Sequence, residues 1–84
     1  MKSVPGQSVS KQTLQRLPTY LSYLKGLQGD SKHISATAIA EALNINHVVV
    51  RKDLASISSS GRPKVGYVRE DLIRELEAFL GYDN

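Results

Sequence analysis

The segment NHVVVRKDL, residues 46–54, places an Arg-Lys pair directly after three valines. Valine is a poor helix former because its β-branched side chain loses χ1 freedom against the preceding turn. The segment nevertheless has a helical pattern, with an Asn in the N-cap position and Val50, Leu54 and Ile57 at the spacing of a buried face. The opposite side of such a helix carries Val48, Lys52, Ala55 and Ser56, flanked by Val49 and Arg51.

The outward residues of this helix have the chemistry to recognise double-stranded DNA. Arg and Lys can donate hydrogen bonds to O6 and N7 of guanine in the major groove, and a small apolar side chain can contact the methyl group of thymine. Other interpretations stay open, because Val48 and Val49 could pack against a protein and Arg51 with Lys52 could be a solvated pair. We expect base contacts, and the alternative is a winged-helix protein-interaction module that uses the Val48/Val49 face.

The residues before this helix predict a helix-turn-helix. Ser35 is placed to cap a helix over 36–43, ATAIAEAL, whose small residues let another helix approach closely. In the following turn, Asn44 can adopt a left-handed conformation that ends this helix, Ile45 can enter the core, and Asn46 can cap the next helix. Two short helices joined in this way are typical of a helix-turn-helix, whose second helix lies in the major groove.

The N-terminal part of the chain predicts a long helix. We expect it to begin at Ser10 and to end at Gly29-Asp30. Pro18 removes one backbone hydrogen bond, so the helix should kink or restart there. The leucines that define its buried face fall at steps of three and four. They are Leu14, Leu17, Leu21, Leu24 and Leu27.

The remaining segments complete a winged helix. His33-Ile34 could form one short strand, and the turn-rich segment 58–64 leads into a β-like VGYV at 65–68. A last helix is expected over about 70–80, with Gly81 as its terminator. The predicted fold class is therefore mostly α: a winged helix-turn-helix with a three-helix core, a short β-hairpin wing and a C-terminal helix.

Size and composition limit the possible functions. Eighty-four residues are enough for one domain with a modest core, and the lack of Cys excludes a disulfide or a thiolate metal site. His33 and His47 have no metal-ligand spacing, and neither a catalytic constellation nor a Gly-rich phosphate loop is present. No apolar run has the length of a membrane span or a signal peptide. We therefore expect a cytoplasmic protein that is not an enzyme and holds no metal.

Charge is divided unevenly along the chain. Residues 1–69 contain ten Lys and Arg against three acids, a charge of +7, whereas residues 70–84 contain one Arg against five acids, a charge of −4. A basic body with an acidic last helix suggests a polyanion-binding surface that faces away from the C-terminus. Asp53 lies beside the core face of its helix, so we interpret it as a structural partner of an arginine, with Arg16 as the candidate.

Further cations could hold the DNA backbone. Arg62 and Lys64 flank Pro63 in the turn GRPK, where a stiffened loop would suit a phosphate ridge or a narrow minor groove. An ordinary polar turn stays open as the other interpretation. Lys11 and Arg16 could bind phosphates at the front of the first helix.

Three stretches of the sequence together resemble one family. The segments RLPTYLSYL (16–24), VRKDL (50–54) and GRPKVGY (61–67) are similar to the N-terminal winged-helix domain of Rex, the bacterial redox-sensing transcriptional repressor. The resemblance implies that this domain precedes a Rossmann domain that binds NADH or NAD⁺. It also implies that a homodimer binds a palindromic operator and that NADH releases it from DNA.

The resemblance assigns roles by position. It places recognition-helix cations at Arg51 and Lys52 and wing cations at Arg62 and Lys64. Lys11 and Arg16 match basic positions before and within the first helix. The family usually has small polar residues at 47–49, so the operator preference is expected to differ here. SISSSG at 56–61 replaces the usual aromatic-glycine pairs, which leaves the setting of the wing open.

The expected organisation follows from these assignments. Residues 1–9 would be a flexible arm, 10–81 the winged-helix domain, and 82–84 the start of a linker to a Rossmann domain outside this sequence. No GxGxxG is present, so we expect no dinucleotide cofactor in this chain, double-stranded DNA as its partner, and a monomeric or weakly dimeric state. The residues expected to contact DNA are Lys11, Arg16, Ser35, Asn46, His47, Val48, Val49, Arg51, Lys52, Arg62 and Lys64.

Overall fold

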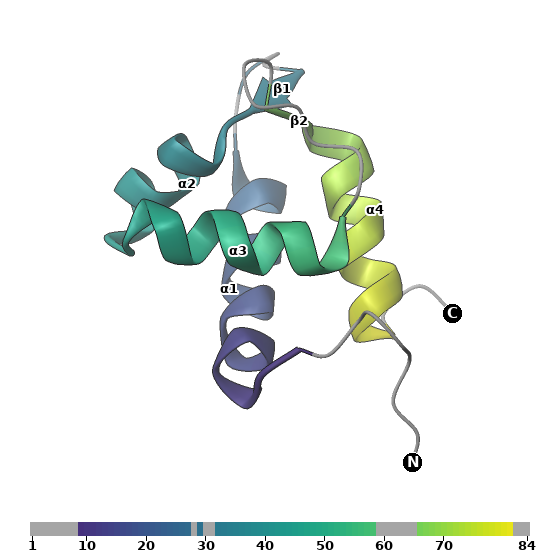
Figure 1. The fold of residues 1–84 in the computed structure, drawn as a ribbon. Helices are drawn as coiled ribbons and strands as arrows, with labels where there is room; N and C mark the ends of the chain where they lie inside the picture. Colours follow the sequence, from purple (N-terminus) through teal and green to yellow (C-terminus); the bar gives the residue numbers. More distant parts are fainter. Residues whose placement is uncertain (1–8, 28, 30–31, 59–65, 82–84) are drawn as a thin grey trace.

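The computed structural model describes residues 9–27, 29, 32–58 and 66–81, which fold into four helices and two short strands (Figure 1). The elements follow the order α1, β1, α2, α3, β2, α4. Their bounds are Lys11–Gly26 for α1, His33–Ile34 for β1, Ala36–Leu43 for α2, His47–Ile57 for α3, Tyr67–Val68 for β2 and Arg69–Leu80 for α4. The predicted class, a mostly helical winged helix-turn-helix, is confirmed.

Helix α1 begins where the sequence predicts and ends earlier. The Ser10 side chain caps it by accepting a hydrogen bond from the backbone N–H of Thr13. The helix runs through Pro18 without a restart, because a proline removes only one bond of the ladder. It ends at Gly26, a poor helix former, and Leu27 is extended, so the predicted end at Gly29-Asp30 was three residues too late.

The turn between α2 and α3 forms as predicted. Ser35 Oγ accepts from the N–H of Ala38, and Asn44 adopts the left-handed conformation at φ 58°. The N–H of Ile45 then donates to the carbonyl of Ala40 at 2.9 Å, which satisfies one of the last carbonyls of α2. Asn46 Oδ1 caps α3 by accepting from the N–H of Val48 at 2.7 Å.

The two strands pair across more than thirty residues of sequence. β1 and β2 are antiparallel, with His33 opposite Val68 and Ile34 opposite Tyr67. Gly66 is required beside them, because its φ is +86° and a Cβ there would lie 2.6 Å from the carbonyl oxygen of Ile34. Within the described part of the chain, β2 therefore pairs with the strand before α2, and the predicted wing, residues 61–66, lies almost wholly outside it.

The core lies where all four helices meet. Its largest fully buried side chains are Leu17, Tyr20, Leu24, Ile39, Val50, Leu54, Leu72 and Leu76. Helix α4 packs along α1, and an ion pair of 2.6 Å joins Lys25 Nζ to Glu77 Oε2. Leu14, predicted to lie on the buried face of α1, is instead 42% exposed.

Candidate nucleic-acid interface

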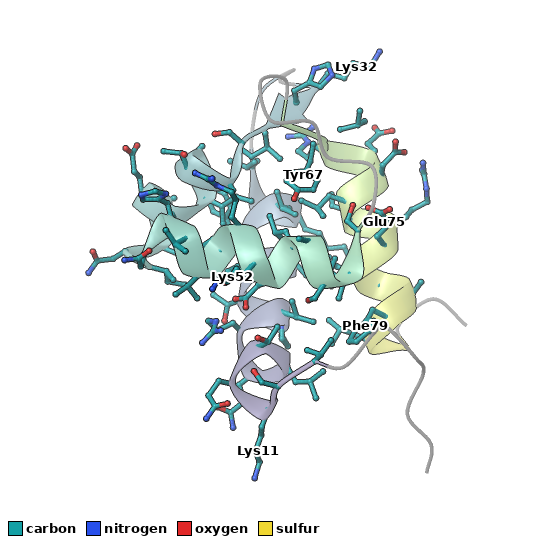
Figure 2. The ribbon with its side chains drawn as sticks, viewed as in Figure 1. Lys11, Lys32, Lys52, Tyr67, Glu75 and Phe79 are labelled. Atoms are coloured by element: carbon teal, nitrogen blue, oxygen red, sulfur yellow. The ribbon has the colours of Figure 1, made fainter. Side chains whose placement is uncertain are left out.

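Helix α3 presents two chemically distinct sides. Val50 and Leu54 are fully buried, whereas Arg51, Lys52 and Ala55 are exposed and Val48 is 46% exposed. Figure 2 shows Lys52 on one side of α3 and Tyr67 on the other. The helical register predicted from the sequence is therefore correct, with a Val, an Arg and a Lys on the outer side.

Three residues at the border of this outer side differ in exposure. His47, the first residue of α3, is exposed. Val49 is half-buried because it lies one turn before the inward-facing Asp53. Ser56 is also half-buried, and its Oγ donates to the backbone carbonyl of Asp53 at 2.6 Å. Ser56 therefore belongs to the border, whereas the sequence had placed it on the outer side.

The outer cations of α3 have no acidic partner among the described residues. The ion pairs found there join Arg16 to Asp53, Lys25 to Glu77 and Arg74 to Asp71. Lys11 is exposed at the start of α1, seen at the lower end of Figure 2. Arg62 and Lys64, the predicted wing cations, lie outside the described residues.

Ser35 and Asn46 are both exposed and serve first as helix caps. Each cap uses a side-chain oxygen as acceptor, in bonds of 3.0 Å and 2.7 Å. The hydroxyl hydrogen of Ser35 and the amide NH₂ of Asn46 take no part in these cap bonds. A phosphate oxygen is an acceptor for such groups, so capping and DNA contact are compatible.

Asp53 faces inward and is held by three residues of α1. Its side chain is 3% exposed, and Oδ1 accepts from Thr13 Oγ1 at 2.8 Å and from Arg16 Nη2 at 2.9 Å. Oδ2 accepts from Arg16 Nε at 2.6 Å and from the hydroxyl of Tyr20. We call these four residues, Thr13, Arg16, Tyr20 and Asp53, the Asp53 cluster.

The cluster shifts the pKa of its members in consistent directions. Burial alone would raise the pKa of Asp53, but the hydrogen bonds from Arg16, Tyr20 and Thr13 hold it below its ordinary value. The hydrogen bond to Asp53 raises the pKa of Arg16, while burial and then the bond to Asp53 raise that of Tyr20. The carboxylate is therefore charged and its phenol and guanidinium partners stay protonated at neutral pH.

Sequence reasoning identified one partner of Asp53 and missed two. The Arg16–Asp53 pair is confirmed. Thr13 and Tyr20 were not assigned, although Thr13, Arg16 and Tyr20 follow one another at steps of three and four and so share a face of α1. Three polar donors on the face that also carries Leu17 and Leu24 were the signal for a buried acid.

The described residues contain neither a metal site nor a membrane-spanning helix. There, no three His, Cys, Asp or Glu side chains gather closely enough to hold a metal ion. No helix within the same ranges is long and apolar enough to cross a membrane.

Sequence comparison places the chain among known proteins. Residues 8–55 match the sequence model of a family described as "Putative DNA-binding protein N-terminus". The chain is 39% identical to the redox-sensing transcriptional repressor Rex of Porphyromonas gingivalis, over 98% of this chain and 41% of that protein. It is 44% identical to Rex of Bacteroides fragilis, over 90% of this chain and 35% of that protein. The chain belongs to the family of Rex N-terminal domains.

A solved structure agrees with this assignment. A crystal structure of RSP in complex with β-NAD⁺ and operator DNA superposes with a TM-score of 0.82 at 32% identity, covering 98% of this chain and 36% of that one. The chain thus spans 35% to 41% of the length of these two Rex proteins. The relatives are named as transcriptional repressors, that is, as regulators of transcription.

Proposed function

We propose that this Rex-family domain binds double-stranded operator DNA, with α3 in the major groove. The observation that carries the proposal is the orientation of α3, which exposes Arg51 and Lys52 while its one acid, Asp53, is buried and paired. An outward acid would be repelled by phosphates, whereas outward cations attract them. The likeness to a Rex-type protein solved with operator DNA supports the same placement.

The proposed contacts divide into base readers and backbone holders. His47, Val48, Arg51 and Lys52 lie on the first two turns of α3, where a recognition helix meets base edges. Val49, half-buried, would touch a base only at the edge of the groove.

The second group would contact the DNA backbone. Lys11, Ser35 and Asn46 are exposed, and Arg62 with Lys64 would contact phosphates or the minor groove. Arg16 is 31% exposed and bound to Asp53, so any phosphate contact would use the outer edge of its guanidinium.

The domain would act within a larger assembly. We propose that the full-length protein is a cytoplasmic homodimer on a palindromic operator, that NADH or NAD⁺ binds outside these 84 residues, and that this chain alone is monomeric. Each isolated domain then has the contacts of only one half-site. Joining two domains supplies an effective concentration that can raise avidity by roughly 10²–10⁴.

Fluorescence titration with a labelled operator duplex at several salt concentrations tests the proposal. If Z phosphates are contacted, log K should fall linearly with log salt with a slope of about −0.9Z. An affinity that does not change with salt concentration, or no binding at all, would contradict DNA recognition. That outcome would favour a protein partner on the Val48/Val49 face, for which the 46% exposure of Val48 is the supporting observation.

A further inference from the structure

The Asp53 cluster is the polar contact between the proposed recognition helix and α1. Tyr20 and Asp53 are almost fully buried, and the three donors from α1 lie within two turns of that helix. Figure 1 shows α3 crossing α1. The hydrogen bonds from Thr13 and Arg16 to Asp53 join these two helices. The cap of α1 belongs to the same network, because Ser10 Oγ donates to Thr13 Oγ1 at 3.0 Å.

The cluster restrains α3 in a way that apolar packing does not. Helix α3 packs most closely against α2, and apolar contacts resist separation but have little directionality. Hydrogen bonds to both carboxylate oxygens require a narrow range of angles. They therefore resist rotation of α3 about its own axis and sliding of α3 along α1.

The orientation of Asp53 determines where its neighbours point. Successive side chains on a helix are about 100° apart, so an inward Asp53 places Lys52 toward one flank of the outer side and Arg51 beyond it. A small rotation of α3 would move both cations relative to base edges. Phosphate contacts from long, flexible lysines would tolerate such a movement better than bidentate base contacts.

We propose that Thr13, Tyr20 and Asp53 are positioning residues for operator recognition, and that their hydrogen bonds align the base-reading residues of α3. This inference rests on the proposed function. Stability alone is a weak explanation for the cluster, because buried ion pairs are often replaceable by apolar residues without loss of stability. The cluster thereby increases the selectivity of the domain for its operator over other DNA sequences. Thr13 and Tyr20 contribute to this selectivity without contacting DNA.

Tyr20→Phe is the primary test. Tyr20 is 0% exposed, so its hydroxyl cannot contact DNA, and the substitution removes the hydroxyl that donates to Asp53. The measured quantity is the ratio of operator affinity to random-duplex affinity, at a temperature where circular dichroism shows every variant fully folded. We expect this ratio to fall roughly threefold to tenfold while random-duplex affinity and its salt slope stay unchanged. NMR amide shifts of the DNA-free variant should change along α3.

Matched variants separate positioning from general destabilisation. Tyr23→Phe removes a hydroxyl from the same helix outside the cluster, and Ile73→Val trims a core-packed side chain of α4. Both should keep the wild-type ratio. Thr13→Val should lower the ratio and Thr13→Ser should restore it, because serine retains the hydroxyl that donates to Asp53.

The outcomes distinguish this inference from the proposed function. If wild type prefers its operator and Tyr20→Phe and Thr13→Val keep that preference, the positioning role is wrong while DNA recognition stands. If Ile73→Val lowers the ratio as much as Tyr20→Phe, the effect is general destabilisation and the positioning role is again wrong. If wild type does not prefer any duplex, the proposed function fails and the positioning role fails with it.

Discussion

Helices α3 and α4 are amphipathic and similar in length, 11 and 12 residues, yet their charged side chains have different partners. On α4, Arg74 pairs with Asp71 at 2.5 Å and Glu77 pairs with Lys25 of α1. On α3, the acid is buried in the Asp53 cluster and the cations face outward without an acidic partner among the described residues. Arg74, Asp71 and Glu77 of α4 are thus engaged in ion pairs within the protein, whereas Arg51 and Lys52 of α3 remain available for a polyanion.

Tyr67 on β2 feels a charge from each of the two helices. Burial raises its pKa, the negative charge of Glu75 on α4 raises it further, and the positive charge of Arg51 on α3 lowers it. The phenol is therefore neutral at physiological pH.

The largest expected effect tests whether the two helices are equivalent inside the core. Leu54 on α3 and Leu76 on α4 are both fully buried. Leu54→Ala and Leu76→Ala should each lower the free energy of unfolding by about 2–5 kcal/mol, because each leaves a cavity. Urea denaturation followed by circular dichroism measures both losses. A near-zero loss in either variant would show that the helix is not part of the common core.

The second prediction sharpens the difference between the outer sides. Lys52→Ala should weaken binding to a preferred duplex by about 1–3 kcal/mol and reduce discrimination at one base pair. Arg74→Ala, an exposed cation of α4, is the matched control and should leave affinity nearly unchanged. Fluorescence anisotropy on matched and mismatched duplexes measures both effects. Equal losses of affinity in the two variants would mean that binding depends only on the net charge of the protein.

The third prediction concerns acid stability. Burial alone would raise the pKa of Asp53, but the bonds from Arg16, Tyr20 and Thr13 lower it below its ordinary value. The stabilisation from Asp53 is therefore fully present above its unfolded pKa, about 3.9, and is lost as pH falls through the lower folded pKa. Thermal unfolding between pH 6 and pH 2 should show wild type losing stability below about pH 4. Asp53→Asn should start less stable and lose less across that range; a parallel pH dependence would refute the assignment.

The smallest expected effect concerns the exposed valine. Val48→Ser should change the free energy of unfolding by no more than about 0.5 kcal/mol, since Val48 lies on the surface. It should alter preference at A·T positions, because the contact to the thymine methyl is lost. Ala78→Ser, on the exposed side of α4, should change neither quantity. Selection of bound oligonucleotides with each variant gives the readout.

The sequence by itself determined the helix-turn-helix and the register of α3. The caps at Ser35 and Asn46 and the left-handed Asn44 involve bonds within a few residues, so local chemistry is sufficient to place the ends of α2 and α3. The outer side of α3 followed from helical periodicity for Val48, Arg51 and Lys52. The contacts of the candidate site with DNA remain proposals, because they depend on a partner that lies beyond the chain.

Only the tertiary structure decided how these elements are held together. Thr13 and Tyr20 meet Asp53 across 40 and 33 residues, β1 pairs with β2 across a similar separation, and Leu14 is exposed despite its position in a leucine pattern. Periodicity assigns residues to a face, but it does not state how far a neighbouring helix extends along that face. The donors of α1 reach the Asp53 carboxylate because α1 and α3 cross at this point. The crossing itself is set by the packing of the core.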